Sequence, residues 1–361
     1  METLDPWSSQ IIDYEKLFKG FGIETMKIRD EKLKENKLFT RGIIFGHRDF
    51  YKWWNDFRNG KRVSILTGMM PSGPFHLGHK MVIDQLVWYQ NLGISITFAI
   101  ADIEARTVRK IDADKVKETV KSYLANAFAL GLKPSQDIYV QSNRSNPYYR
   151  LADLLSSKMT FAEVEAIYGN MTPGKMISAF TQASDILHKQ LPDYFGKHKI
   201  LVPVGPDQDP HIRLSRDLAD RIGFIKPSAT YHGFARGLDG GKMSSSKPTS
   251  YIGLDEPIDV VKRKVANALT GGRNTLEEQK KLGGQPEKCI IFELYKYHFE
   301  DDDAKLSERE RMCRAGEIMC GECKKQLIEK ITKWLEKHQH KKDKEMARAE
   351  KFVEENIDYP F

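Results

Sequence analysis

Two histidines lie three residues apart in the segment PSGPFHLGH, residues 71–79. An apolar run ends just before this segment and an amphipathic run follows it, so we expect a strand that turns into a helix. His76 and His79 then share one face of the first helical turn. The free N–H groups and positive dipole end of that turn favour an anion, and Gly68, Gly73 and Gly78 allow it to approach the backbone. The pattern predicts a phosphate site, although helix capping alone is the alternative.

Two other segments carry groups suited to a nucleotide. In LDGGKMSSSKP, residues 238–248, Lys242 and Lys247 flank three serines behind a glycine hinge. Such a loop can close over a triphosphate, although its composition equally suits a disordered linker. In VGPDQDPH, residues 204–211, Asp207 and Gln208 follow an apolar run and suit a ribose or an amino group. Taken alone, that segment is a plain turn.

The four cysteines all lie in the last quarter of the chain, which does not suggest a disulfide framework. Cys320 and Cys323 have the spacing of metal ligands, but Cys289 and Cys313 lie 24 residues apart rather than forming a second such pair. We expect ordinary thiols and no metal site, with a zinc site as the lesser alternative. A reducing, cytoplasmic location is expected.

Composition bounds the class of protein. The chain has 361 residues, of which 40% are hydrophobic and 30% charged, enough for two or three packed domains. Apolar stretches are only strand-length, so no membrane association is expected. Residues 324–351 hold ten Lys and Arg against five Asp and Glu. This excess can attract nucleic-acid phosphates, or it is a solvated helix face.

The elements that must position these groups alternate between strand and helix. Strands are expected at 63–66, 94–101, 138–140 and 200–204, with a helix between the second and third; this alternation implies a parallel sheet covered on both faces. We expect an N-terminal extension over 1–60, a catalytic domain over 61–255 with a helical insertion at about 145–195, and a helical domain over 256–361. Leu327, Ile331, Trp334, Leu335 and His338 form one face of a long helix in that last domain.

The pairing of HLGH at 76–79 with KMSSSK at 242–247 resembles the two signatures of class I aminoacyl-tRNA synthetases. The stretches DPW at 5–7, RGIIFGHRD at 41–49 and DQDPHIR at 207–213 extend the resemblance over nearly the whole chain, to the archaeal and eukaryotic type of tryptophanyl-tRNA synthetase. The resemblance implies a Rossmann-type catalytic domain, a helical anticodon-binding domain and a homodimer. It also implies ATP with Mg²⁺, L-tryptophan and tRNA(Trp) as partners.

The resemblance carries roles onto particular residues. His76, His79, Lys242 and Lys247 are expected to act in catalysis. Lysines of the basic segment are expected to contact tRNA: Lys324, Lys325, Lys330, Lys333, Lys337, Lys341 and Lys342. The expected ATP-binding residues are Thr67, Gly68, Ser72, Gly73, Phe75, His76, Gly78, His79, Gly205, Asp207, Gln208, Lys242, Met243, Ser244, Ser245 and Ser246.

The amino-acid pocket departs from the family pattern in one respect. Glu104 and Gln208 are retained for the ammonium side, but Leu66 and Ala99 stand where the eukaryotic enzymes place a Tyr and a Gln that hold the indole N–H. A buried indole N–H needs another polar partner. Gln182 and Asp185 are the candidates, and ordinary polar residues of a cleft are the alternative.

Three other functions remain open at this point. A tyrosine-specific relative would share both signatures, an adenylyltransferase would share the first, and an RNA-binding paralogue without activity would keep the fold. The intact histidines and lysines count against the last of these.

Overall fold

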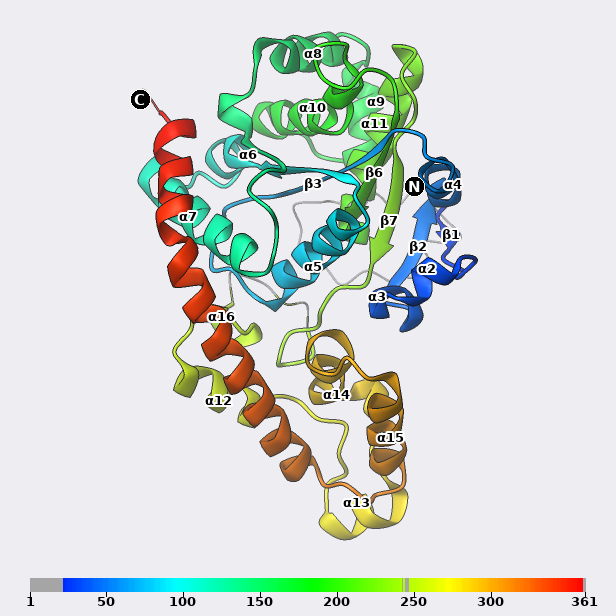
Figure 1. Cartoon of the computed structure of the whole chain (residues 1–361), viewed down its shortest axis with the longest axis vertical. Coiled ribbons are helices and arrows are strands. Elements are labelled where there is room, and N and C mark those ends of the chain that lie inside the picture. The colour runs from blue at the N-terminus through cyan, green and yellow to red at the C-terminus, as the bar shows by residue number, and fades with distance from the viewer. Residues whose placement is uncertain (1–21, 242, 244–246, 360–361) are drawn as a thin grey trace.

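The computed structural model describes residues 22–241, 243 and 247–359. Its centre is a seven-stranded sheet in the order β1-β2-β7-β6-β3-β4-β5 (Figure 1). The strands are β1 (Glu24–Thr25), β2 (Ile44–Arg48), β3 (Val63–Met69), β4 (Ser95–Ile100), β5 (Asp137–Val140), β6 (Lys199–Val204) and β7 (Ser228–His232).

The strands from β7 to β5 run parallel to their neighbours, whereas β2 and β1 extend the sheet antiparallel at one edge. The four strands expected from sequence are therefore confirmed. Three that were not expected extend the sheet beyond β6: β7, whose residues are all buried, and then β2 and β1, which come from the first 60 residues. The parallel strands end at one edge of the sheet, where ligands bind in such folds.

Helices cover both faces of the parallel strands, as such a sheet requires (Figure 1). Helices α8 to α10 lie between β5 and β6 in the chain. The helices are α2 (Glu31–Lys34), α3 (Lys37–Thr40), α4 (Phe50–Arg58), α5 (Leu77–Asn91), α6 (Asp102–Thr107), α7 (Ala113–Ala129), α8 (Asn146–Ser156), α9 (Phe161–Tyr168), α10 (Pro173–Leu187), α11 (Asp209–Arg221), α12 (Ile258–Asn267), α13 (Leu276–Leu282), α14 (Ile290–Leu294), α15 (Asp303–Arg314) and α16 (Cys320–Asn356).

Aromatic side chains attach the N-terminal part of the chain to the sheet. Phe50, Trp53 and Trp54 of α4 are buried, and the Trp54 ring stacks on Trp88 of α5 with centroids 6.1 Å apart. The Trp53 Nε1 donates a hydrogen bond of 3.1 Å to the carbonyl oxygen of Ser64 in β3. A buried indole with a satisfied N–H both packs and fixes its partner strand.

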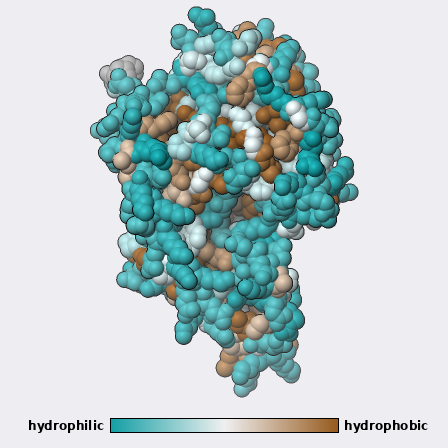
Figure 2. All heavy atoms as spheres, viewed as in Figure 1, coloured by the Kyte–Doolittle hydropathy of each residue, from teal (hydrophilic) through white to brown (hydrophobic). Residues whose placement is uncertain are grey.

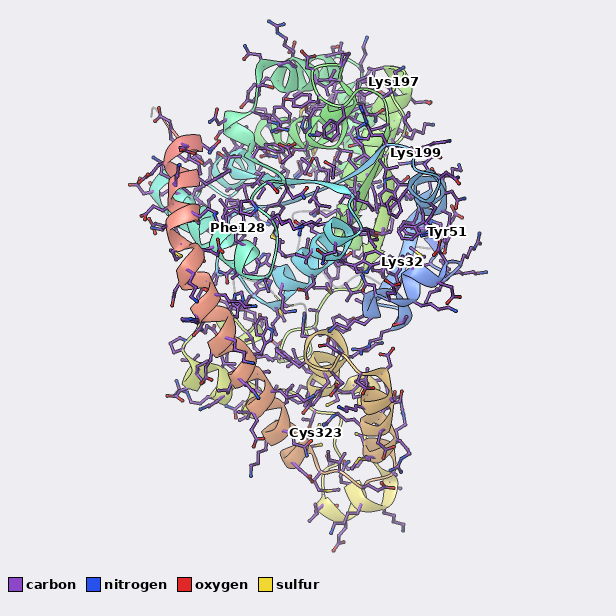
Figure 3. All side chains as sticks on the ribbon, in the orientation of Figure 1. Lys32, Tyr51, Phe128, Lys197, Lys199 and Cys323 are labelled. Carbon is purple, nitrogen blue, oxygen red and sulfur yellow. The ribbon has the colours of Figure 1, made fainter. Side chains whose placement is uncertain are left out.

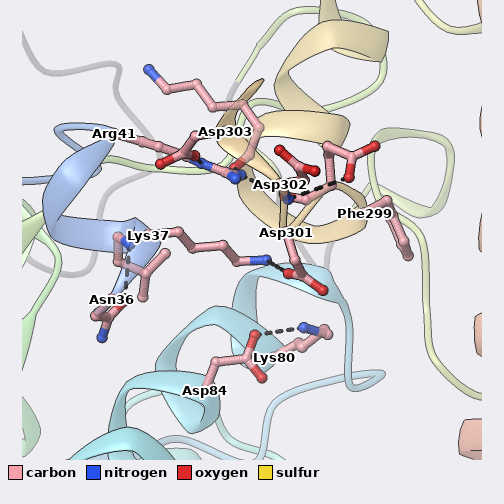
Figure 4. A network of polar contacts seen from close by, with 12 residues as sticks. Asn36, Lys37, Arg41, Lys80, Asp84, Phe299, Asp301, Asp302 and Asp303 are labelled. Atoms are coloured by element: carbon pink, nitrogen blue, oxygen red, sulfur yellow. Dashed lines mark hydrogen bonds and ion pairs between the residues drawn. The ribbon is translucent and has the colours of Figure 1, made fainter. Parts of the chain in front are cut away.

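Ion pairs join the N-terminal helices to the C-terminal helical region (Figure 4). Lys37 of α3 lies 2.6 Å from Asp301, and Arg41 lies 2.7 Å from Asp303, while Lys80 of α5 pairs with Asp84 just below them. Asp301, just before α15, and Asp303, its first residue, are thereby held against α3 and its C-cap residue Arg41, which lie 264 and 262 residues earlier in the sequence.

The long helix α16 packs along α7 and α12 with the apolar face that the sequence predicted. Leu327, Ile331, Leu335 and His338 are buried, and the Trp334 ring stacks on His338 with centroids 5.0 Å apart. Trp334 therefore packs within the protein, as its helical spacing indicated.

Candidate active site

A cavity of about 730 Å³ opens at the carboxyl ends of the central strands. On the face shown in Figure 2, apolar side chains gather over the sheet within a largely hydrophilic surround. Most of the predicted site residues line this cavity: Leu66, Thr67, Gly68, Ser72, His76, Gly78, His79, Glu104, Gln182, Asp185, Gly205, Asp207, Gln208 and Met243.

The two histidines cap the helix and line the cavity at the same time. His76 is the N-cap of α5, and its Nδ1 accepts a hydrogen bond of 3.1 Å from the Gly78 N–H. In return the His79 Nδ1 accepts from the His76 N–H, also at 3.1 Å. The two rings stack with centroids 3.9 Å apart. Capping and phosphate binding, which the sequence posed as alternatives, are therefore compatible roles for the same residues.

These hydrogen bonds decide where the protons lie. An Nδ1 that accepts from a backbone N–H carries no proton, so each neutral ring is protonated on Nε2. Burial lowers the pKa of His76 to about 4 and that of His79 well below its usual value. Each ring is therefore neutral at pH 7. The His76 Nε2 can donate to an anionic oxygen, whereas the His79 Nε2 lies 3.4 Å from the Tyr123 hydroxyl and would have to exchange that contact for one.

Gly78 lies between these rings because no side chain fits there. A Cβ at this position would stand 2.9 Å from the His76 Cε1. The glycine thus permits the close packing of the two histidines, in addition to any approach by a ligand.

The segment that follows the lysine-serine loop is hydrogen-bonded to the first motif. The Leu77 N–H donates to the Ile252 carbonyl oxygen at 3.1 Å, and the Leu254 N–H donates to the Phe75 carbonyl oxygen at 2.8 Å. Within the loop itself, Met243 lines the cavity. Two motifs about 160 residues apart in the sequence therefore meet at one opening.

Three predicted residues do not line the cavity. Phe75 is fully buried behind it and packs on Tyr123, and Gly73 lies in the turn before the helix. Lys247 is 61% exposed and forms an ion pair with Asp239. The predicted residues Lys242, Ser244, Ser245 and Ser246 lie outside the described part of the chain.

The side of the cavity next to α10 holds two buried carboxyl groups. Glu104, in the first turn of α6, accepts a hydrogen bond of 2.7 Å from the Gln182 Nε2. Asp185 accepts from the hydroxyls of Tyr139 and Tyr148 on Oδ1, at 2.5 and 2.8 Å, and from the Gln141 Nε2 on Oδ2, at 2.6 Å.

Burial raises the pKa of Asp185 to about 6, although the three donors favour the ionised form and oppose this shift. Sequence reasoning missed Gln141, Tyr139 and Tyr148. Tyr139 was visible near the end of the third predicted strand, but nothing in the sequence indicated that its hydroxyl meets α10. His211, in the quoted DQDPHIR stretch, also lines the cavity, and its Nδ1 lies 2.8 Å from the Tyr168 hydroxyl.

The basic residues of α16 differ in their surroundings. Lys330 pairs with Glu300, Lys342 pairs with Asp255 at 2.7 Å, and the Lys324 Nζ donates to the Ala266 carbonyl oxygen at 2.6 Å. These three are engaged within the protein. The other four candidates are exposed, and three of them recur every fourth residue: Lys325, Lys333, Lys337 and Lys341.

A parallel α/β sheet with two histidines at a helix mouth, against which the segment 252–254 is paired, has the arrangement of a class I aminoacyl-tRNA synthetase. The family model described as tRNA synthetases class I (W and Y) matches residues 58–336, and the chain belongs to this family.

Two curated relatives are both named tryptophan–tRNA ligase. The chain is 48% identical to the tryptophan–tRNA ligase of Hyperthermus butylicus, over 97% of this chain and 98% of that protein. It is also 48% identical to the one from Aeropyrum pernix, over 98% of each.

Solved structures agree with these relatives. The crystal structure of tryptophanyl-tRNA synthetase from Aeropyrum pernix K1 has a TM-score of 0.90 at 45% identity, covering 99% of this chain and 100% of that one. The enzyme of Encephalitozoon cuniculi, solved bound to tryptophan, has a TM-score of 0.82 at 26% identity, covering 95% and 98%. Among the described helices, none has the length and apolar character needed to cross a membrane.

Proposed function

We propose that this chain is a tryptophan–tRNA ligase, which activates L-tryptophan with ATP and transfers it to the 3′ end of tRNA(Trp). The observation that carries the proposal is the backbone pairing of 75–77 with 252–254 beside the cavity. This pairing, together with Met243 at the cavity, supports a loop that can reach the helix mouth. The shared name of the relatives, at 48% identity over nearly the full length, supports tryptophan as the amino acid.

In the first step the tryptophan carboxylate attacks the α-phosphorus of ATP, and pyrophosphate leaves with the electron pair of the broken bond. No protein nucleophile is required, so catalysis consists of positioning and charge stabilisation. His76 and His79 donate hydrogen bonds from their Nε2 atoms to phosphate oxygens as negative charge develops there. The N-terminus of α5 adds its partial positive charge.

The pyrophosphate is held from the other side by the lysine-serine loop. Lys242 and Lys247 neutralise it, and Ser244, Ser245 and Ser246 donate hydrogen bonds. To reach the phosphates, Lys247 must break its exposed ion pair with Asp239. Breaking a surface ion pair costs little free energy. Phosphate oxygens of the nucleotide and water would hold Mg²⁺, which would offset part of the negative charge on the phosphates. The ribose and adenine lie against a further set of residues: Thr67, Gly68, Ser72, Gly73, Phe75, Gly205, Asp207 and Met243.

The amino acid occupies the side of the cavity near α10. Glu104 and Gln208 bind the ammonium group, and Leu66 and Ala99 form apolar walls for the ring. Asp185 accepts the indole N–H on Oδ2, where the Gln141 amide occupies one of two acceptor positions. This assignment replaces the missing Tyr and Gln of the eukaryotic pattern with one carboxylate.

The second step uses the basic face of α16. Lys325, Lys333, Lys337 and Lys341 contact tRNA phosphates, because they are exposed, whereas the other three candidates first have to leave their partners. The enzyme acts as a homodimer in the cytoplasm.

Pyrophosphate exchange with each of the twenty amino acids tests the proposal directly. Only tryptophan should support exchange, and tRNA(Trp) should then be charged. The His79→Asn variant serves as the inactive control. Exchange with tyrosine alone would assign a tyrosine-specific relative, and exchange with none would leave a paralogue without activity.

A further inference from the structure

His232 is a histidine of the active-site cavity that lies apart from the pair at the helix mouth. It is the last residue of β7, and its side chain is buried. The carboxyl end of β7 lies beside α5, and side chains fill the space between the two elements (Figure 3). His232 belongs to neither signature motif, and no step described for the reaction uses it.

A single amide decides where the proton of the His232 ring lies. The Gln85 Nε2 of α5 donates to the Met81 carbonyl oxygen at 3.4 Å and lies 3.3 Å from the His232 Nδ1. The reverse amide orientation would place two oxygens against each other. Because an amide nitrogen only donates, the His232 Nδ1 accepts and carries no proton. The neutral ring therefore carries its proton on Nε2.

The Nε2–H group of His232 has no acceptor within the protein. Among residues 22–241, 243 and 247–359, none forms a hydrogen bond with the His232 Nε2. Burial lowers the pKa of His232 to about 4, so the ring is neutral at pH 7 and keeps this single donor. A buried donor without an acceptor costs free energy. At the wall of a cavity, such a donor is available to a ligand.

The cavity wall next to His232 is mainly apolar. Met81 shares the Gln85 amide with His232, and Ala235 follows three residues later in the chain. The Ala235 carbonyl oxygen accepts a hydrogen bond of 3.3 Å from the Met243 N–H. All three side chains line the cavity and belong to one hydrophobic core. We call the space bounded by Met81, His232, Ala235 and Met243 the methionine recess.

The methionine recess continues into the helix mouth. A Cβ on Gly78, in the first turn of α5, would stand 3.8 Å from the Met243 Sδ. A Cβ on Gly205 would stand 3.0 Å from the Phe234 Cε1 and 2.7 Å from the Asp207 Oδ1, so the recess also adjoins the residue proposed for the ribose.

The cavity wall near Asp185 belongs to a different hydrophobic core, which includes residues of α8 to α11. Its cavity-lining members are Leu66, Ile186, Val202 and Ile212. The recess and the proposed indole site are therefore separate parts of one cavity.

We propose that His232 is a specificity-determining residue for the nucleotide, whose adenine ring lies in the methionine recess and accepts a hydrogen bond from the His232 Nε2 on a ring nitrogen. This inference rests on the proposed function, in which ATP is the substrate. Adenine is a flat ring whose N1, N3 and N7 atoms are acceptors, and methionine side chains adapt to such a shape. A phosphate in the recess would exchange its water for one donor, which is unfavourable.

Binding of ATP and of its 1-deaza, 3-deaza and 7-deaza analogues to the full chain, measured by calorimetry, tests this contact. Each analogue replaces one ring nitrogen with C–H. Because an unpaired buried donor is costly, at least one analogue should bind the wild type about 5- to 150-fold more weakly than ATP. Equal binding of all three analogues and ATP would overturn the proposal without the need for any variant.

The same measurement separates this contact from the proposed function, because it needs neither amino acid nor tRNA. A chain that shows the analogue penalty but supports no pyrophosphate exchange would refute the ligase and keep the adenine contact. Absence of any ATP binding would overturn both.

Substitutions of the ring provide the matched comparison. His232→Phe keeps a ring but removes the donor, so the affected analogue should bind this variant as tightly as ATP does. His232→Gln offers an amide N–H in place of Nε2 and should retain the penalty. His211→Phe makes the same change at a cavity histidine that contacts Tyr168 of the other hydrophobic core, and its penalty should equal that of the wild type.

The double comparison of analogue and variant distinguishes a direct contact from a structural role. A structural role would weaken ATP and all analogues of the His232→Phe variant equally, and would leave the penalty in place. A penalty that persists in folded His232→Phe therefore overturns the proposal. If His232→Phe does not fold, His232→Asn takes its place, because its shorter amide can meet Gln85 but lies too far back to replace Nε2.

Discussion

The proposed contact between Asp185 and the indole N–H leads to a quantitative prediction. In Asp185→Asn the acceptor loses its negative charge, while the side chain keeps nearly the same shape. A hydrogen bond to a charged group contributes about 1.5–3 kcal/mol. Since about 1.4 kcal/mol corresponds to a factor of ten, kcat/KM for tryptophan should fall by about 10- to 150-fold.

An analogue without the N–H separates this contact from general damage. In pyrophosphate exchange with the analogue whose ring nitrogen is replaced by sulfur, the same variant should lose little activity, because there is no bond to lose. Gln182→Asn, on the same helix, is the matched control, and it should affect both substrates equally. Equal losses for both substrates in Asp185→Asn would refute the assignment.

The raised pKa gives the same contact a pH dependence. Because burial raises the pKa of Asp185 to about 6, the carboxyl is ionised at pH 7 and becomes protonated as the pH falls towards 5. Protonation removes the charged acceptor, so KM for tryptophan should rise below pH 6 in the wild type. The rise should be absent in Asp185→Asn and with the sulfur analogue. A KM that stays flat in the wild type would show that Asp185 does not contact the ring.

Three further substitutions test other parts of the molecule. Gly78→Ala places a Cβ 2.9 Å from the His76 Cε1, so pyrophosphate exchange should fall by about tenfold or more. The loss is expected even though alanine is favoured over glycine in a helix by about 1 kcal/mol. Unchanged activity would contradict the tight packing of the two rings. Tyr359→Phe removes the 2.8 Å hydrogen bond from the Tyr359 hydroxyl to Asp102 in α6, the helix that carries Glu104. The loosened helix should raise KM for tryptophan several-fold. An effect on KM for ATP instead would contradict an action through Glu104. Replacing Lys333, Lys337 and Lys341 by Glu should raise KM for tRNA and weaken the salt dependence of tRNA binding. Pyrophosphate exchange should stay intact. Loss of exchange would mean that these lysines support the fold.

Much of the sheet was predictable because its strands are buried on both faces and read as continuous apolar runs. The strand β7, SATYH, was not predictable: it is short and polar, and it becomes a strand only because β6 and β2 pair with it on either side. Likewise β2 owes its place to tertiary pairing, and the sequence indicated only that its segment carried aromatics that had to be buried.

The site shows the same division. Glycine and histidine spacing predicted that His76 and His79 share the first turn of a helix, because that arrangement depends on one local turn. Their phosphate role stays a prediction. The partners of Asp185 were not predictable, since Tyr139 and Tyr148 come from a strand and a helix whose side-chain directions the sequence leaves open. The four cysteines are a further example, because the sequence does not group them, whereas in the fold they line one small cavity beside α14, α15 and α16: Cys289, Cys313, Cys320 and Cys323.

The length of α16 has a mechanical consequence. Its 37 residues form one unbroken helix, which spans about 55 Å at 1.5 Å per residue. The helix begins at Cys320, beside the small cavity lined by the cysteines. Further along, His338 is hydrogen-bonded to Asn126, and the Gln339 Nε2 donates to the carbonyl oxygens of Leu254 and Glu256. A continuous helix bends only gently, so α16 keeps its two ends at a nearly fixed distance from each other. A polynucleotide that contacts both ends of α16 must therefore adapt its own curvature to that fixed distance.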